Sequence, residues 1–188
     1  MVLDRLTCQR CGDTVDASQS VVFCQRCGNQ IRPRAVDAKP FVLDSNVYDQ
    51  LVGTPKHQLL FINACNTGRI ELLMTHIQHD ELMNHPDQAT RNAIFTIPFV
   101  VTMTSGVVLG TSKLGLARFG EPGKIDAVRS PNGNHTNDAL IAATAQAEGS
   151  ILVTEERRLT NQARRQGIEV WAAAELIGYV EKLDRAAP

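Results

Sequence analysis

The 188-residue sequence lacks any long apolar run of the kind that crosses a membrane. Its most apolar stretch, from Ile94 to Gly110, is interrupted by polar residues and by Pro98. It therefore falls short of the roughly 18 apolar residues that a membrane span needs. The start of the chain, from Met1 to Leu6, contains charged residues and no apolar segment resembling a signal peptide. We therefore expect a cytoplasmic protein with no membrane association.

The chain also lacks a strong net charge, because 19 Lys and Arg residues are balanced by 20 Asp and Glu residues, for a formal charge of −1. The molecule as a whole is thus not a basic nucleic-acid binder. Residues 1–39 contain six Lys/Arg and four Asp, a net of +2, and the remainder has a net of −3. The mild excess of acids after residue 39 suits a metal site, although solvated surface acids explain it equally well.

Two nucleotide-binding signatures are absent as well. The sequence contains neither the glycine-rich fingerprint of dinucleotide-binding folds nor a P-loop. A phosphatase interpretation would need a second acid two residues after Asp44, but that position is Asn46. These absences argue against nucleotide-dependent and phosphatase chemistry.

What the sequence does contain is a pair of identical cysteine turns near its start. They are Cys8-Gln-Arg-Cys11-Gly and Cys24-Gln-Arg-Cys27-Gly, with 12 residues between Cys11 and Cys24. Four thiolates from two such turns suit the tetrahedral coordination of Zn²⁺, and a site closed by four protein ligands is structural. Disulfides are not expected in the cytoplasm, and Cys65, which has no partner at this spacing, is predicted to be a buried core residue.

These cysteine turns suggest a division of the chain into a zinc ribbon at residues 1–30, a linker at 31–39 and a larger domain at 40–183. About 30 residues cannot form a sufficient core alone, so the metal would stabilise the ribbon. The ribbon is either only a small folded unit or an RNA-binding surface. In the second case the contacts to RNA phosphates would come from Arg10, Arg26, Arg32, Arg34 and Lys39.

From residue 40 onward, short apolar segments alternate with helix-like segments. We expect strands at 41–44, 69–74, 150–154 and 168–171, and a β-rich stretch at 98–108. We expect helices at 56–66, 75–84, 87–95, 137–148, 156–166 and 172–183, with Thr75 and Thr136 as N-caps. This alternation predicts βαβ units, and therefore an α/β fold with a central parallel sheet covered on both faces.

Four acidic positions could meet at one edge of this sheet. Asp44 ends the first strand, Glu155 and Glu156 follow a later strand, Asp138 lies in the first turn of a strong helix, and Glu81 lies on another helix. In open α/β sheets, ligands bind beyond the carboxyl ends of the strands. Clustered carboxylates repel one another unless a cation neutralises them, and their hard oxygens favour Mg²⁺ or Mn²⁺. Each acid taken alone could equally be a helix-dipole partner or a solvated surface residue.

The larger domain also resembles a known family. The matching segments are VLDSNV at 42–47, DEL at 80–82, NDALIAATA at 137–145, and Gly149 followed by ILVTEE at 151–156. Residues 40–180, about three quarters of the chain, resemble the PIN-domain ribonucleases, whose corresponding text reads LDTNV, EL and NDxLIAATA…G…LVTxD. The resemblance implies a three-layer α/β/α fold with a central parallel sheet.

The resemblance further implies an endoribonuclease that hydrolyses RNA phosphodiester bonds with Mg²⁺ or Mn²⁺. Asp44, Glu81 and Asp138 match the family's metal-binding acids, and Glu156 stands where the fourth acid is normally Asp. Glu155 is adjacent and is an alternative fourth acid. Matching polar positions, which would orient the acids or the attacking water, are Asn46, Asn137 and Thr154.

Several alternatives stay open at this point. The longer Glu156 side chain favours a second hypothesis, in which the site is silent and the chain binds RNA or protein without cleaving. Members of the family act as toxins held by an antitoxin or as enzymes that mature ribosomal RNA, so an antitoxin or a ribosome-related protein is an expected partner. A homodimer is also compatible with the resemblance.

Overall fold

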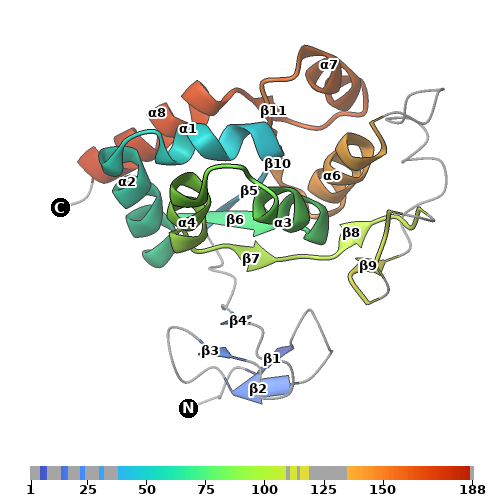
Figure 1. Ribbon diagram of the computed structural model, residues 1–188, viewed down its shortest axis with the longest axis horizontal. Helices are drawn as coiled ribbons and strands as arrows, with labels where there is room; N and C mark the ends of the chain where they lie inside the picture. The colour runs from blue at the N-terminus through green and yellow to red at the C-terminus, as the bar shows by residue number, and fades with distance from the viewer. Residues whose placement is uncertain are drawn as a thin grey trace.

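The computed structural model describes residues 38–108, 111–113, 115–118 and 135–186, and the backbone of four short strands nearer the N-terminus. These strands form two antiparallel pairs: β1 (Arg5–Thr7) with β2 (Thr14–Asp16), and β3 (Val22–Phe23) with β4 (Gln30–Ile31) (Figure 1). The four predicted zinc ligands lie outside the described residues: Cys8, Cys11, Cys24 and Cys27. The zinc ribbon and the division of the chain at residues 30 and 39 therefore stay predictions.

A five-stranded sheet forms the centre of the larger domain. Its strands are β5 (Lys39–Leu43), β6 (Ile70–Met74), β7 (Val100–Val101), β10 (Ile151–Val153) and β11 (Val170–Trp171). All neighbouring strands are parallel, and their order is β11-β10-β5-β6-β7. This sheet and its flanking helices confirm the predicted α/β class. Strand β5 begins at Lys39, the residue that the sequence placed last in the linker.

The central strand β5 separates the two halves of the core. Side chains alternate along a strand, so Phe41 and Leu43 pack on one face of the sheet and Val42 packs on the other. The first face is covered by α1 (Tyr48–Val52), α2 (Pro55–Asn66), α4 (Gln88–Thr96) and α8 (Ala173–Arg185). The second face is covered by α6 (Thr136–Ala147) and α7 (Arg157–Arg165), while α3 (His76–Met83) contributes to both clusters.

Three local features differ from the sequence-based expectations. Thr136 is the first residue of α6, and the N-cap is His135, whose φ of 67° is left-handed. The short helices η1 (Ser45–Val47) and α1 were not predicted, because they are too brief to show a helical periodicity. The β-rich stretch at 98–108 divides into β7 and β8 (Thr104–Ser105), and β8 pairs in parallel with β9 (Ala117–Arg118).

The expectations for the N-cap Thr75, for the glycines that end two helices and for Cys65 agree with the structure. Thr75 is the N-cap of α3, and Gly149 and Gly167 follow α6 and α7 with left-handed φ values of 59° and 74°. Cys65 is buried in the core, as predicted. Within the described part of the chain, no helix combines the length and the apolar character needed to cross a membrane.

Gln78 ties the central strand to the helix that carries Glu81. Its Oε1 accepts hydrogen bonds from the backbone N–H and the hydroxyl of Thr75, both at 2.6 Å, and its Nε2 donates to the carbonyl of Leu43. The side chain is completely buried. Gln78 therefore fixes the start of α3 against the end of β5, where Asp44 follows.

We expect Gln78→Ala to lower the free energy of unfolding by about 2–4 kcal/mol, because buried polar groups on both elements lose their partner. The measurement is chemical denaturation followed by circular dichroism. Gln50→Ala, on the exposed face of α1, is the matched control and should change stability little. Equal effects of the two substitutions would contradict the bridging role.

Candidate functional site

The candidate site begins at the point where the strand order reverses. From β5 the chain adds β6 and β7 on one side, and it then returns to add β10 and β11 on the other side. Parallel sheets bind ligands beyond the carboxyl ends of the two strands that flank such a point. Asp44 follows β5 and Thr154 follows β10, so both residues lie at this position.

Asp44 is buried here and held by Thr154. The Thr154 hydroxyl donates to Asp44 Oδ2 at 2.6 Å, and the Asp44 N–H donates to the carbonyl of Val153 at 2.8 Å. Burial raises the pKa of Asp44 above its ordinary value, and the hydrogen bonds from Thr154 and the backbone of Ser45 oppose that rise. The charges of Glu156 and Glu81 raise the same pKa further. Asp44 is therefore fixed in position and close to two other acids.

Glu81 reaches the same place from α3. Its carboxylate is exposed, and one oxygen accepts a hydrogen bond from the Ser45 hydroxyl. The other oxygen accepts from Asn137 Nδ2 at 2.7 Å. Glu81 is thus linked to the residue after Asp44 and to the residue before Asp138. The nearby acids also influence the fully buried phenol of Tyr48, whose pKa is raised first by burial and then by the charges of Asp44 and Glu81.

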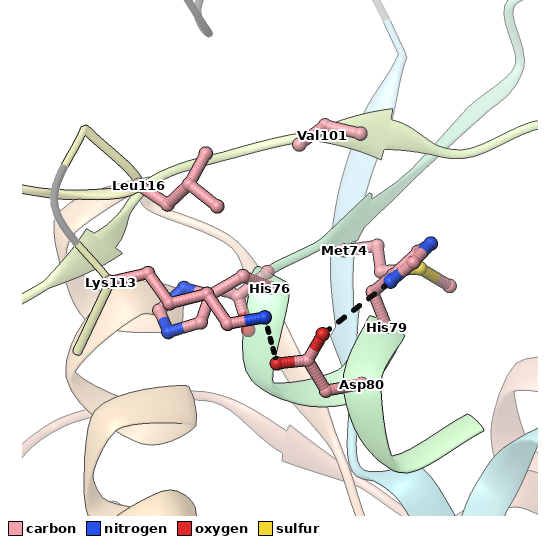
Figure 2. A pocket seen from close by; sticks show the side chains of 8 residues that line it. Met74, His76, His79, Asp80, Val101, Lys113 and Leu116 are labelled. Carbon is pink, nitrogen blue, oxygen red and sulfur yellow. Dashed lines mark ion pairs between the residues drawn. The ribbon is translucent and has the colours of Figure 1, made fainter. Parts of the chain in front are cut away.

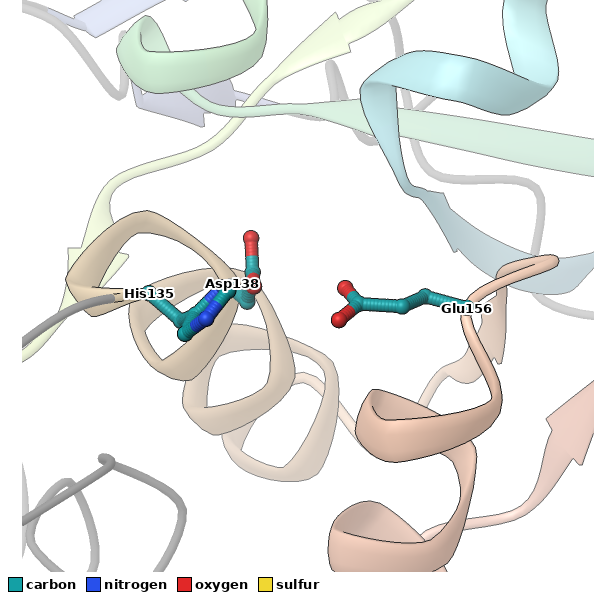
Figure 3. A group of neighbouring side chains, drawn as sticks. All are labelled: His135, Asp138 and Glu156. Carbon is teal, nitrogen blue, oxygen red and sulfur yellow. Dashed lines mark ion pairs between the residues drawn. The ribbon is translucent and has the colours of Figure 1, made fainter.

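Asp138 and Glu156 face each other across the gap between α6 and the start of α7 (Figure 3). Among the described residues, His135, Asp138 and Glu156 offer ligand atoms that all lie within 4.8 Å of one another. Burial raises the pKa of Asp138, and the charges of Glu156 and Asp44 add to that rise. Arg158 and His135 lower the same pKa, so the cations only partly offset the repulsion among the acids.

Arg158 contacts both Asp138 and Glu156, and His135 contacts Asp138. Neither residue was identified from the sequence. Arg158 donates from Nη2 to Asp138 Oδ2 at 2.8 Å and from Nε to Glu156 Oε1 at 3.1 Å. His135 Nδ1 lies 3.2 Å from Asp138 Oδ2. Their spacing could have suggested these contacts, since His135 is three residues before Asp138 and Arg158 is two residues after Glu156.

The other predicted positions divide between the site and its surroundings. Glu155 is exposed and accepts a hydrogen bond at 2.8 Å from the N–H of Ala173, at the start of α8. It therefore points away from Asp138, whereas Glu156 points toward it. Asn46 is exposed on η1, and no hydrogen bond joins it to the four acids in the described part of the chain.

A pocket of about 290 Å³ lies at the ends of β6 and β7 (Figure 2), and its lining includes none of the four acids. Met74, Val101 and Leu116 contribute apolar walls. Asp80, the neighbour of Glu81 on α3, accepts an ion pair from Lys113 at 2.5 Å, and its pKa is lowered chiefly by that hydrogen bond. Lys113 thus pairs with the residue that precedes Glu81 in the chain.

The donor set fits a hard divalent cation. Asp138 and Glu156, together with His135, offer ligand atoms within 4.8 Å of one another, and the pKa values of Asp44 and Asp138 are raised because these carboxylates are desolvated and repel their neighbours. A bound dication would relieve that repulsion, and carboxylate oxygens are the ligands that Mg²⁺ and Mn²⁺ prefer. The described residues whose ligand atoms lie close enough to hold such an ion are His135, Asp138 and Glu156, and Asp44 and Glu81 are the further ligands that the sequence predicts.

Comparisons with known proteins identify no family for this chain. No protein-family model matches it, and no curated protein matches it. Among solved structures it is similar to PAE2754 from Pyrobaculum aerophilum, with 15% identity and a TM-score of 0.48 over 77% of this chain and 98% of that one. It is also similar to FitAcB from Neisseria gonorrhoeae, with 16% identity and a TM-score of 0.39 over 71% of this chain and 97% of that one.

A third solved structure, FitAB bound to an IR36 DNA fragment, has 15% identity and a TM-score of 0.37 over 71% of this chain and 94% of that one. Similarities this low identify neither an activity nor a substrate.

The raised pKa of Asp44 predicts a characteristic pH dependence of stability. An acid whose pKa is higher in the folded state contributes stability below its unfolded pKa, here near 3.8, and this is lost as pH rises through the folded pKa. With a chelator present, Asp44→Asn should therefore be more stable than the parent at pH 7, with the difference closing near pH 4. Thermal unfolding across this pH range is the measurement.

The substituted amide retains an oxygen that can accept from Thr154, so the hydrogen bond need not be lost. Asp184→Asn, on the exposed end of α8, is the control and should show no such pH-dependent gain. If Asp44→Asn were less stable than the parent at pH 7 in chelator, the assignment of Asp44 as a destabilised buried acid would be wrong.

Proposed function

We propose that this protein is an Mg²⁺- or Mn²⁺-dependent endoribonuclease of the PIN-domain kind. The observation that carries the proposal is a group of acids near the β5–β10 switch point, in which Asp138 and Glu156 offer ligand atoms within 4.8 Å and the charges of Glu81 and Glu156 raise the pKa of the buried Asp44. These are the residues that the family resemblance in the sequence assigns to the metal. The preference for RNA as substrate comes from that resemblance.

The surrounding side chains have definable roles in such a reaction. A divalent cation supplies Lewis acidity toward the phosphodiester and lowers the pKa of water. Thr154 orients the carboxylate of Asp44, and Asn137 and Ser45 orient that of Glu81. Burial and repulsion raise the pKa values of Asp44 and Asp138 in the absence of metal, and a bound cation would keep both groups as carboxylates and therefore as its ligands. In such a hydrolysis the water oxygen bonds to phosphorus as the bond to the leaving oxygen breaks, and the proton lost by the water balances the proton gained by the leaving oxygen.

The arginines near the N-terminus remain part of the proposal as RNA-phosphate contacts: Arg10, Arg26, Arg32 and Arg34. Lys39 is removed from that set by its surroundings. Its ammonium lies 4.4 Å from the centre of the Trp171 ring and 5.5 Å from that of Tyr179. Lys39 is therefore engaged within the domain by a cation–π contact.

The geometry supports Glu156, and not Glu155, as the fourth acid. Glu156 lies opposite Asp138, whereas Glu155 caps the start of α8. The extra methylene of glutamate is accommodated because Glu156 is the N-cap residue of α7 and projects across the gap to α6. Glutamate at this position is thus compatible with a shared cation.

We expect the purified protein to cleave RNA only with Mn²⁺ or Mg²⁺ present, and Asp44→Asn to lower the rate at least about 100-fold. Glu156→Gln should also lower it strongly, while Glu155→Gln, its matched neighbour, should leave it nearly unchanged. Cleavage of a labelled RNA followed on a denaturing gel is the measurement. Metal-independent cleavage, or equal rates for Asp44→Asn and the parent, would contradict the proposal.

A second candidate function is a silent module that binds RNA or protein without cleaving. The specific observation in its favour is that Arg158 already pairs with Asp138 and Glu156 and supplies positive charge to them. Calorimetric titration with Mn²⁺ separates the two functions, because a silent site would bind none.

The biological setting is part of the proposal and rests on the resemblance alone. A toxin would have an antitoxin as its partner, and a processing enzyme would act with ribosomal components. Expression of the chain by itself separates these roles, since a toxin halts growth in an Asp44-dependent manner and a processing enzyme does not.

The four N-terminal cysteines are proposed to hold one structural Zn²⁺. Elemental analysis of the purified chain should give about one zinc per molecule, and Cys8→Ser together with Cys11→Ser should abolish it. Cys65→Ser, which changes a cysteine buried in the core, serves as the control and should leave the zinc content unchanged. Zinc retained by the double variant would exclude this ligand set.

A further inference from the structure

Arg158 is positively charged, yet it contacts residues that are proposed to bind a metal cation. It lies in the first turn of α7, and its side chain is 31% exposed. All three guanidinium nitrogens are engaged: Nε with Glu156, Nη2 with Asp138, and Nη1 with Gln162 Oε1 at 2.9 Å. Two of these partners are proposed ligands of the metal.

The guanidinium uses the same oxygens that a metal ion would need. Asp138 Oδ2 and Glu156 Oε1 each accept from it, and those two carboxylates lie close enough to share one cation. A metal ion that takes both oxygens must displace these hydrogen bonds. One that uses the remaining oxygens must bind beside a positive charge.

Building on the proposed function, we propose that Arg158 is an internal counter-ion that competes with the divalent metal for Asp138 and Glu156. It neutralises the acids when no metal is bound and thereby lowers the affinity of the site for the ion. Gln162, one turn along α7, holds Nη1 away from both acids, so the guanidinium has an anchor that does not depend on them.

An opposite role is conceivable for the same contacts, and the two differ in sign. If Arg158 served to position Glu156 for the metal, its removal would weaken metal binding. If Arg158 competes with the metal, its removal strengthens binding. The sign of the change in affinity therefore decides between them, and the readout does not depend on RNA cleavage.

The test is calorimetric titration of the full chain with Mn²⁺, comparing the parent, Arg158→Gln and Arg157→Gln. Arg157 is the matched control, because it is exposed in the same helical turn and carries the same charge. Arg158→Gln should bind Mn²⁺ roughly three- to tenfold more tightly than the parent, as expected for the loss of two partly exposed ion pairs. Arg157→Gln should stay within about twofold of the parent.

Thermal unfolding gives a second, independent comparison. In chelator, Arg158→Gln should unfold at a lower temperature than the parent, because Asp138 and Glu156 then face each other without their counter-ion. Added Mn²⁺ should raise its unfolding temperature by more than it raises that of the parent.

Each outcome bears on a distinct claim. Equal or weaker Mn²⁺ binding by Arg158→Gln overturns the competition. Absence of Mn²⁺ binding by both proteins overturns the competition and the metal site of the proposed function together. A parent that binds Mn²⁺ but cleaves no RNA overturns the proposed function, while the affinity comparison still decides the role of Arg158.

Discussion

The parallel pairing of β5 with β10 places a buried aspartate beside a buried threonine, and the rest of the site is arranged around that contact. Strands that are distant in the chain become neighbours at the centre of the sheet, so Asp44 and Thr154 meet at 2.6 Å. Burial makes the Asp44 charge costly, and the hydroxyl of Thr154 relieves only part of that cost. The other acids then add to a negative potential that the protein groups present do not fully balance.

The excess of negative charge among these acids is what makes the site suited to the proposed binding of a cation. A sheet whose strand order reverses offers a crevice with side chains from several elements, and here those side chains are mainly carboxylates. Hydrogen bonds from Thr154, Ser45 and Asn137 fix the orientation of two acids. Arg158 and His135 hold a third. The acids are therefore prearranged before any ligand arrives, which reduces the ordering that binding would require.

The sequence predicted the parts of this arrangement that depend on local pattern. Strand ends at Asp44 and Thr154 followed from short apolar runs, and the helix bearing Asp138 followed from its apolar face. Arg158 and His135 were missed because their contacts depend on how α7 packs against α6, which no local pattern encodes. The different surroundings of Glu155 and Glu156 could not be predicted from the sequence, because both are acids and the contact that distinguishes them is the hydrogen bond from the Ala173 N–H to Glu155.

The hydrogen bond from the Ala173 N–H to Glu155 connects the candidate site to the C-terminal helix α8. Glu155 accepts a hydrogen bond from the first turn of α8, whereas the carboxylate of Glu156 lies close to that of Asp138. Helix α8 packs on the sheet face that carries Phe41 and Leu43, opposite the face covered by α6 and α7. It is connected to Glu156 by the hydrogen bond to Glu155 and by the peptide bond between the two glutamates. A displacement of α8 that broke this hydrogen bond would remove one restraint on the residue that precedes Glu156.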